Sequence, residues 1–273
     1  MSSEKEGAFH IVDVPSITPG PLRATLRTSD GVRVEAVHAP YKAPHTDSVT
    51  DTAIVVAHGF TGSVDRPAVR RAARAFGRRA GVVTFSFRGH GRSGGRSTVG
   101  DREVLDLAAA VAWARELGYA RVATVGFSMG GSVVLRHAAL HKDPADGART
   151  DAVVAVSAPA RWYYRGTAPM RRLHWVVTRP AGRLVGRYGL RTRIHDRDWD
   201  PVPMPPVEAV PLIAPTPLLI VHGDRDPYFP VDHPRMLAAA GPAELWIEPG
   251  MGHAENAADD ALLARIADWL SVP

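Results

Sequence analysis

One serine stands in a pattern that would make it a nucleophile. Ser128 lies in Gly126-Phe127-Ser128-Met129-Gly130, between a β-branched run over 122–125 and a helical pattern over 129–141. In such a strand-turn-helix unit the serine sits on a tight turn, and side chains at 126 or 130 would collide with the crossing backbone. The pattern predicts a nucleophile elbow with an exposed Ser128 hydroxyl, with an ordinary Gly-rich turn as the alternative.

A serine hydroxyl is a weak nucleophile at neutral pH and needs a neighbouring base. Among the 12 histidines, His253 stands in Gly250-Met251-Gly252-His253, between the last predicted strand and the last predicted helix. This loop emerges at the same end of a parallel sheet as Ser128, and its two glycines leave the backbone free to orient the ring. We predict that His253 is the base. His58 and His90, at other strand ends, are expected to be structural.

The base in turn needs a carboxylate that fixes its tautomer and stabilises the imidazolium. Asp224 and Asp226 both follow the penultimate predicted strand and both qualify by location. Asp226 is the preferred candidate because it lies farther along the loop. Asp224 is better placed to cap the turn through its own backbone, as Asx residues do.

An acyl-transfer reaction also needs two backbone N–H groups that hold the oxyanion. Met129 directly follows the candidate nucleophile. Phe60 lies in His58-Gly59-Phe60-Thr61-Gly62, the loop after the apolar run 53–57, and its glycines permit close backbone approach. We predict that the N–H groups of Phe60 and Met129 form the oxyanion hole.

The pattern of strands and helices indicates how these residues are positioned. Two runs, 22–28 and 32–38, read as a hairpin joined by Ser29-Asp30-Gly31. Strands predicted at 53–57, 82–87, 122–125, 152–156, 217–221 and 244–247 then alternate with helices predicted at 67–79, 102–117, 129–141, 234–240 and 257–270. The alternation favours an α/β fold, a mostly parallel sheet with helices on both faces.

The pattern of strands and helices also predicts the domain organisation. Residues 1–21 are expected to form an N-terminal tail, and residues 22–273 a single domain. Residues 159–215 interrupt the alternation and are rich in Pro, Arg and aromatic residues. We predict that they are an irregular cap inserted over the carboxyl ends of the strands, where ligands bind in open α/β sheets.

Composition excludes several classes of protein. The chain has 273 residues, 45% of them hydrophobic and 22% charged, which is typical of a packed globular protein. Without Cys it has no disulfide, iron–sulfur cluster or cysteine nucleophile. The first 20 residues lack a secretory apolar core, and no apolar run reaches 18 residues, so the expected location is cytoplasmic. No cofactor or metal is expected.

The basic residues raise the question of partners. The net charge is +5, and all but three of the 33 basic residues are Arg, which we interpret as GC-rich coding. No nucleic-acid partner is expected, since no nucleic-acid-binding motif accompanies the charge. Nine Arg and no acidic residue lie between Ala152 and His195, interleaved with aromatic residues. This segment suits an acidic substrate or a transient contact with an anionic lipid surface, with a solvated Arg face as the alternative.

Taken together, these motifs resemble those of the α/β-hydrolase superfamily over about residues 22–273. The resemblance rests on His58-Gly59-Phe60, on the run 87–93 (FRGHGRS), on Gly126–Gly131, on Asp226, and on Gly252-His253. The chain order Ser, Asp, His is that of the superfamily. The resemblance implies an eight-stranded sheet with one antiparallel strand near its edge and a cap insertion after the sixth strand. It also supports Asp226 over Asp224.

The resemblance is strongest to serine esterases and monoacylglycerol-lipase-like members. The predicted function is a serine hydrolase that cleaves a carboxylic ester, such as a lipid or acyl ester, through an acyl-enzyme intermediate. A small-molecule ester is the expected substrate. A thioesterase or a C–C-bond hydrolase with the same triad is the alternative enzyme, and a non-catalytic ligand-binding protein on this fold is the alternative outside enzymes.

Overall fold

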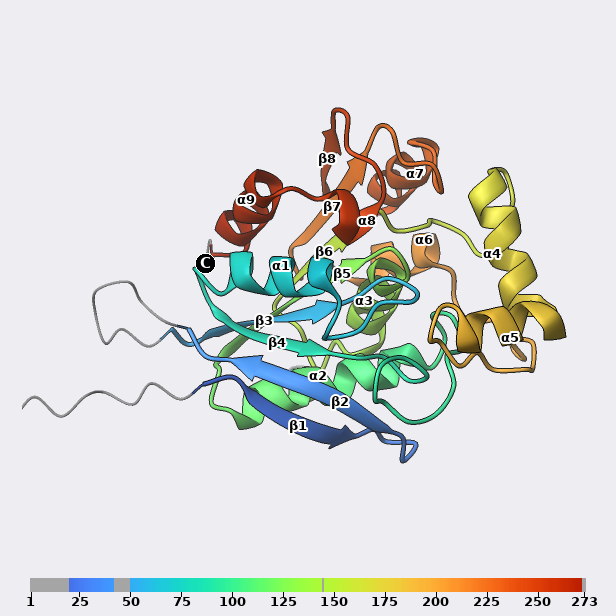
Figure 1. The fold of residues 1–273 in the computed structure, drawn as a ribbon. Helices are drawn as coiled ribbons and strands as arrows, with labels where there is room; N and C mark the ends of the chain where they lie inside the picture. Colours follow the sequence, from blue (N-terminus) through green and yellow to red (C-terminus); the bar gives the residue numbers. More distant parts are fainter. Residues whose placement is uncertain (1–19, 42–49, 144, 272–273) are drawn as a thin grey trace, which may run out of the picture.

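The computed structural model describes residues 20–41, 50–143 and 145–271 (Figure 1). At its centre is an eight-stranded sheet in the order β1-β2-β4-β3-β5-β6-β7-β8. The strands are β1 (Leu22–Arg27), β2 (Arg33–Ala39), β3 (Thr52–Ala57), β4 (Gly81–Phe85), β5 (Arg121–Phe127), β6 (Ala152–Val156), β7 (Leu218–Gly223) and β8 (Glu244–Glu248). Only β2, next to the edge strand, runs against the others among these strands, so the predicted fold class is confirmed.

The apolar runs form the middle of the sheet because both of its faces are covered. β4 and β6 are buried along their whole length, and β3 is buried from Ala53 onward. Such strands read as continuous apolar runs, since neither face is left to solvent. The edge strand β1 instead has an exposed and half-buried pattern.

Helices cover both faces of the sheet, as predicted. One core cluster joins the sheet to α1 (Pro67–Phe76), α8 (Ala254–Ala257) and α9 (Asp260–Leu270). The other joins it to α2 (Glu103–Glu116), α3 (Met129–Leu140) and α7 (Asp232–Ala240). In Figure 1, α1 lies in front of the sheet and α2 lies partly behind β2. The ends of the strands therefore remain as the place where loops gather.

The segment between β6 and β7 is more ordered than the sequence suggested. It contains α4 (Ala168–Thr178), α5 (Pro180–Tyr188), α6 (Pro206–Ala209) and the short 3₁₀ helix η1 (Val210–Leu212). The expectation of irregular structure was wrong for α4 and α5. Pro169 and Pro180 suggested irregular structure in the sequence, but they stand in the first turns of these helices. A proline there starts a helix, since its missing N–H would have no partner within the helix.

The β6–β7 segment lies beyond the carboxyl ends of the strands, with α4 and α5 at the right of Figure 1. It is tied to the loop after β4 by a short parallel bridge between Ser97 and Ile194. The Ser97 N–H donates to the Arg193 carbonyl at 2.7 Å, and the His195 N–H donates to the Ser97 carbonyl at 2.8 Å. The designation of residues 159–215 as a cap stays a prediction.

Two other expectations are not decided by the fold. Residues 1–19 of the predicted tail lie outside the described residues, and β1 begins at Leu22. No helix in the described ranges is long and apolar enough to cross a membrane. The domain boundaries and the cytoplasmic location stay predictions.

Three of the buried histidines have strongly lowered pKa values. Burial lowers the pKa of His58 and of His137 to about 3, and that of His233 to about 4. Neither ring nitrogen of His137 has a hydrogen-bond partner. All three rings are therefore neutral in the folded protein at neutral pH.

These histidines predict a loss of stability in mild acid. Below a pH of about 6.5 the unfolded chain binds a proton at each of these rings, whereas the folded chain does not. As the pH is lowered, the free energy of unfolding therefore decreases by about 1.4 kcal/mol per pH unit for each ring. Urea unfolding followed from about pH 7 to about pH 5 should show this slope. His137→Phe should make it shallower by about one proton, and an unchanged slope would contradict this account of His137.

Candidate active site

The turn at Ser128 carries the geometry that the sequence pattern predicted. Ser128 has φ +53° and ψ −114°, and α3 begins at the next residue. A Cβ on Gly126 would lie 2.1 Å from the Gly130 carbonyl oxygen, and one on Gly130 would lie 2.2 Å from the Ala57 carbonyl oxygen. Only glycine fits at either position, because backbone atoms cannot move aside as a flexible side chain would. The crossing of α3 over the end of β3 thus fixes the turn.

The structure brings the three side chains predicted for a triad into one hydrogen-bonded chain. Ser128 Oγ lies 2.8 Å from His253 Nε2, and His253 Nδ1 lies 2.7 Å from Asp226 Oδ2. They come from the ends of three strands: β5 leads into Ser128, β7 into the loop of Asp226, and β8 into that of His253. With the proton on Nδ1, Nε2 is free to accept the serine proton.

Asp226 is held as a carboxylate by its surroundings. Its side chain is fully buried, and burial alone would raise its pKa. The hydrogen bond and charge of His253, together with the backbone N–H groups of Tyr228 and Phe229, outweigh burial and hold the pKa of Asp226 below its usual value. Those N–H groups donate to Oδ1 at 2.8 and 3.1 Å, which leaves Oδ2 for His253.

Asp224 has a different task from the one expected. The sequence suggested that it caps its own turn, but its Oδ1 accepts the Gly250 N–H at 2.7 Å, from the loop after β8. Its own N–H donates to the Glu248 carbonyl. Asp224 is exposed and joins the two loops that carry Asp226 and His253. The expectation that it caps its own turn was wrong because the neighbouring loop offers a backbone N–H donor.

The two residues predicted to supply the oxyanion hole lie at the pocket of the serine. Phe60 and Met129 line the same pocket as Ser128. Neither of their backbone N–H groups donates a hydrogen bond to any residue that the structure describes. Met129 is the first residue of α3, where the helix supplies no acceptor. Both donors are thus available to a ligand.

His58 and His90 have structural contacts. His58 Nδ1 lies 2.7 Å from the Gly59 carbonyl oxygen, and its Nε2 accepts the Phe87 N–H at 3.0 Å. His90 Nδ1 lies 2.9 Å from the Arg88 carbonyl oxygen. Both rings are fully buried, and they brace the loops after β3 and β4.

Sequence reasoning missed a buried carboxylate that joins two parts of the site. Glu255 stands two residues after His253, and its Oε1 accepts the Gly59 N–H at 3.0 Å. A Cβ on Gly59 would lie 3.1 Å from both Glu255 oxygens and 3.4 Å from Ser128 Cβ. Glu255 is therefore a positioning residue for the loop that holds Phe60. Nothing in its sequence context marked it, since its partner is 196 residues away.

Two further contacts fix the base. The Tyr228 ring lies against the His253 ring, with centroids 4.4 Å apart and planes tilted by 31°. Ser157, just after β6, accepts the Ala254 N–H at 3.0 Å, and Ser157 and Ala254 both have positive φ. The imidazole is thus held by its ring face and by the backbone after it.

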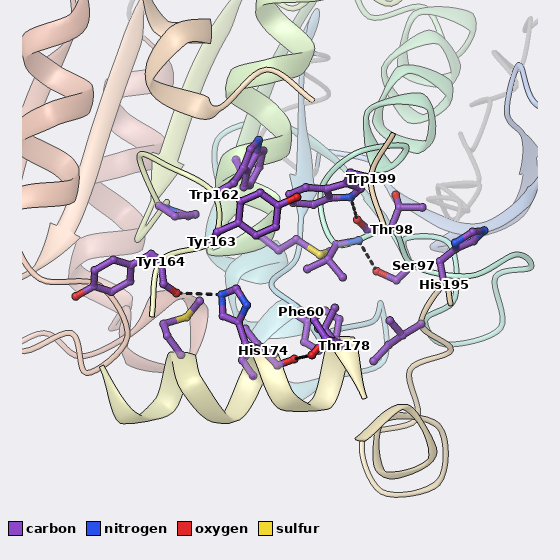
Figure 2. Close-up of a pocket in the computed structure, with 18 of the residues that line it drawn as sticks. Phe60, Ser97, Thr98, Trp162, Tyr163, Tyr164, His174, Thr178, His195 and Trp199 are labelled. Carbon is purple, nitrogen blue, oxygen red and sulfur yellow. Dashed lines mark hydrogen bonds between the residues drawn. The ribbon is translucent and has the colours of Figure 1, made fainter. Parts of the chain in front are cut away.

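A pocket of about 160 Å³ opens over Ser128, and its walls are mainly apolar. The β6–β7 segment supplies most of the lining, shown in Figure 2, including Trp162, Tyr163, Tyr164, Met170, Leu173 and Trp199. Phe60, Val99 and Phe229 add to it from other loops. Rings and aliphatic side chains of this kind bind an apolar group.

Several polar groups of this lining have partners within the protein. The Trp199 indole N–H donates to the Thr98 carbonyl at 2.7 Å, and the Trp162 indole N–H to the Pro203 carbonyl at 2.8 Å. On α4, His174 Nε2 lies 3.0 Å from the Tyr164 carbonyl oxygen (Figure 2). The aromatic walls are thereby fixed in orientation. No group of three or more candidate metal ligands occurs in the described parts of the chain.

Comparison with known proteins agrees with this fold. A family model described as the alpha/beta hydrolase fold matches residues 52–170. Esterase Pf2001 from Pyrococcus furiosus is 22% identical with a TM-score of 0.67, over 92% of this chain and 91% of that one. The esterase domain of a Rhodothermus marinus protein is 21% identical with a TM-score of 0.62, over 92% and 96%.

A third structure, XC6422 from Xanthomonas campestris, is a serine hydrolase described as having no lid. It is 20% identical with a TM-score of 0.58, over 94% of both chains. No curated protein matches this chain. Residues 52–170 thus match the alpha/beta hydrolase fold family, and the solved structures share that fold over most of the chain, in agreement with the resemblance seen in the sequence.

The two aspartates give a paired test of the acid. Asp226→Asn removes the acceptor that fixes the His253 tautomer and should lower kcat for ester hydrolysis on the order of 10³-fold or more. Asp224→Asn keeps an oxygen for the Gly250 N–H and should retain most of the activity. Steady-state kinetics with p-nitrophenyl acetate make the comparison. A larger loss at Asp224 would reverse the two roles.

Substitution of Glu255 should lower kcat through the position of the Phe60 N–H rather than through the triad. Glu255→Ala releases the Gly59 N–H and lets the Phe60 donor drift, which should lower kcat roughly tenfold to 100-fold with little change in KM. Glu255→Gln keeps an acceptor oxygen and should restore most of kcat. Thermal midpoints of both variants serve as the control. Equal kcat losses in the two variants would show that the hydrogen bond from the Gly59 N–H to Glu255 does not determine kcat.

Proposed function

We propose that this protein is a serine hydrolase that cleaves a carboxylic ester through an acyl-enzyme intermediate. The observation that carries the proposal is the continuous chain from Ser128 Oγ through His253 to the buried Asp226 carboxylate, with distances of 2.8 and 2.7 Å. Ser128, at the end of these hydrogen bonds, lines a pocket that Phe60 and Met129 also line, and the backbone N–H groups of these two residues have no acceptor among the described residues.

In the proposed reaction Ser128 Oγ attacks the ester carbonyl carbon while His253 Nε2 takes its proton. The negative oxygen of the tetrahedral intermediate accepts hydrogen bonds from the Phe60 and Met129 N–H groups. His253 then gives the proton to the leaving alkoxide, and the C–O bond breaks. Water, deprotonated by His253, attacks the acyl-enzyme and releases the acid and free Ser128.

Asp226 acts through His253 in each of these steps. Its lowered pKa keeps it ionised at neutral pH, so its charge stabilises the imidazolium that forms when Ser128 loses its proton. The hydrogen bond to Nδ1 keeps Nε2 pointed at the serine. The two effects together let His253 act as the base that activates the Ser128 hydroxyl as a nucleophile.

The pocket supports an ester whose acyl or alcohol part is apolar. Its lining is dominated by aromatic and aliphatic side chains, and its indole N–H groups already have partners. An apolar group therefore gains burial there without leaving either indole N–H unsatisfied. A thioester or an activated C–C bond would use the same steps, so the leaving group is decided by experiment.

Ser128→Ala tests the nucleophile. The variant should fold normally, because alanine leaves the Gly126 and Gly130 contacts unchanged, and should lose activity on the order of 10³-fold or more. Wild-type protein should be labelled by a fluorophosphonate probe and Ser128→Ala should not. Retention of a tenth of the activity, or labelling of the variant, would reject Ser128.

A substrate series then separates the alternatives. The wild type is assayed on p-nitrophenyl esters of increasing acyl length, on monoacylglycerols and on acyl thioesters of matched length. Higher kcat/KM for oxygen esters supports the proposal, and a clear preference for thioesters replaces it with a thioesterase. Fluorophosphonate labelling without turnover of any substrate would favour a ligand-binding protein.

A further inference from the structure

Helix α5 exposes its largest apolar side chains to solvent. Leu184 is 58% exposed, Val185 46% and Tyr188 74%. With Ala181, which is also exposed, they recur at the i, i+3, i+4 and i+7 spacing of one helix face. An ordinary surface helix turns such a face toward the core.

The side of α5 that faces the protein is made of glycine instead. Gly182 and Gly186 are buried, four residues apart on the opposite face. A Cβ on Gly182 would lie 2.3 Å from the Trp175 carbonyl oxygen, and one on Gly186 would lie 2.8 Å from Ile194 Cδ1. The close packing of α5 onto α4 and onto Ile194 thus uses small residues and leaves the bulky apolar residues exposed.

Helix α4 continues this outer surface with positive charge. Its inner face lines the pocket through Met170, Leu173 and Val177. Its outer face carries Arg171, Arg172, Trp175 and Arg179, all exposed. Trp175 is 47% exposed, so an indole stands among the guanidinium groups.

Most of the positive charge in this region has no ion-pair partner among the described residues. Nine Arg and no acidic residue lie between Ala152 and His195. Of these nine, only Arg161 pairs with a carboxylate among the described residues, Asp232 at 3.5 Å. The apolar face of α5 is flanked by Arg183, Arg187 and Arg191, and Arg187 also lies over the Tyr188 ring. We call the exposed residues of α4 and α5 the docking face.

From this combination we infer that the docking face binds the surface of an anionic lipid bilayer. An interfacial helix needs bulky apolar residues that enter the acyl boundary and basic residues that meet the anionic headgroups, and the docking face presents both. A second copy of this chain would bring two unpaired Arg clusters together, which like-charge repulsion opposes. A nucleic acid would use the Arg residues and leave the apolar face of α5 exposed.

Docking would also serve the proposed hydrolase. Because the other side of α4 forms a wall of the pocket, the bound protein holds Ser128 close to the membrane surface. An amphiphilic ester could then reach the pocket from the lipid phase. This consequence rests on the proposed function, whereas the docking itself rests on the surface alone.

The test is co-flotation of Ser128→Ala protein, which isolates binding from hydrolysis, with phospholipid vesicles. The protein should float with vesicles of equal parts phosphatidylglycerol and phosphatidylcholine at low salt. It should not float with phosphatidylcholine alone, and binding should weaken several-fold at about 0.5 M salt, where surface charges are screened. Absence of flotation with anionic vesicles at low salt would overturn the proposal.

Paired variants locate the surface. Arg172→Glu/Arg187→Glu should weaken partitioning roughly tenfold or more. The control is Arg74→Glu/Arg78→Glu, an equal charge change on two exposed residues at the end of α1 and just beyond it, which should have a much smaller effect. Equal losses would mean that net charge alone drives adsorption, and would overturn the assignment to the docking face.

The apolar residues need their own test. Leu184→Ser/Tyr188→Ser keeps every Arg and should also lower partitioning, because the helix loses the groups that enter the acyl boundary. Unchanged binding would overturn an interfacial helix. If light scattering shows that the unmutated protein is a dimer and this variant a monomer, the face is a contact between copies and the lipid proposal fails.

Discussion

The site depends on one steric constraint, the crossing of the first turn of α3 over the end of β3. The absence of side chains at Gly126 and Gly130 lets backbone approach backbone there, and the crossing forces Ser128 into a positive φ. A non-glycine residue in that region is strained, and such strain persists only where the surrounding structure over-determines it. Here the Ser128 N–H bond to Val156 and the packing of α3 on the sheet hold it.

The remaining groups are brought to the serine by loops that also hold one another. Asp224 joins the loop after β7 to the loop after β8, Glu255 in α8 binds the loop after β3, and Ser157 accepts the Ala254 N–H. Each contact spans elements that are distant in sequence. The loops after β3, β6 and β7 are thus each bonded to the segment after β8, which explains how a 2.8 Å contact forms between residues 125 positions apart.

The sheet, the helices on its two faces and the grouping of Ser128, Asp226 and His253 could be predicted because their signals are local. β-branched runs mark buried strands, and glycines around Ser128 mark a turn that no other residue fits. The roles of Asp224 and Glu255 could not be read, since each bonds a backbone N–H that only the tertiary fold brings near. Helices α4 and α5 were missed because Pro169 and Pro180 stand where a proline begins a helix as readily as it ends one.

The bridge between Ser97 and Ile194 has a kinetic consequence. It fastens the wall of the pocket to a loop whose backbone is itself held by the buried Glu103 carboxylate, which accepts the N–H groups of Thr98 and Gly100. With its walls anchored and its indoles already bonded, the pocket is preorganised, so little conformational entropy is lost when a ligand enters. Association should then follow a single-step rate law, linear in ligand concentration, with no slow opening step that saturates.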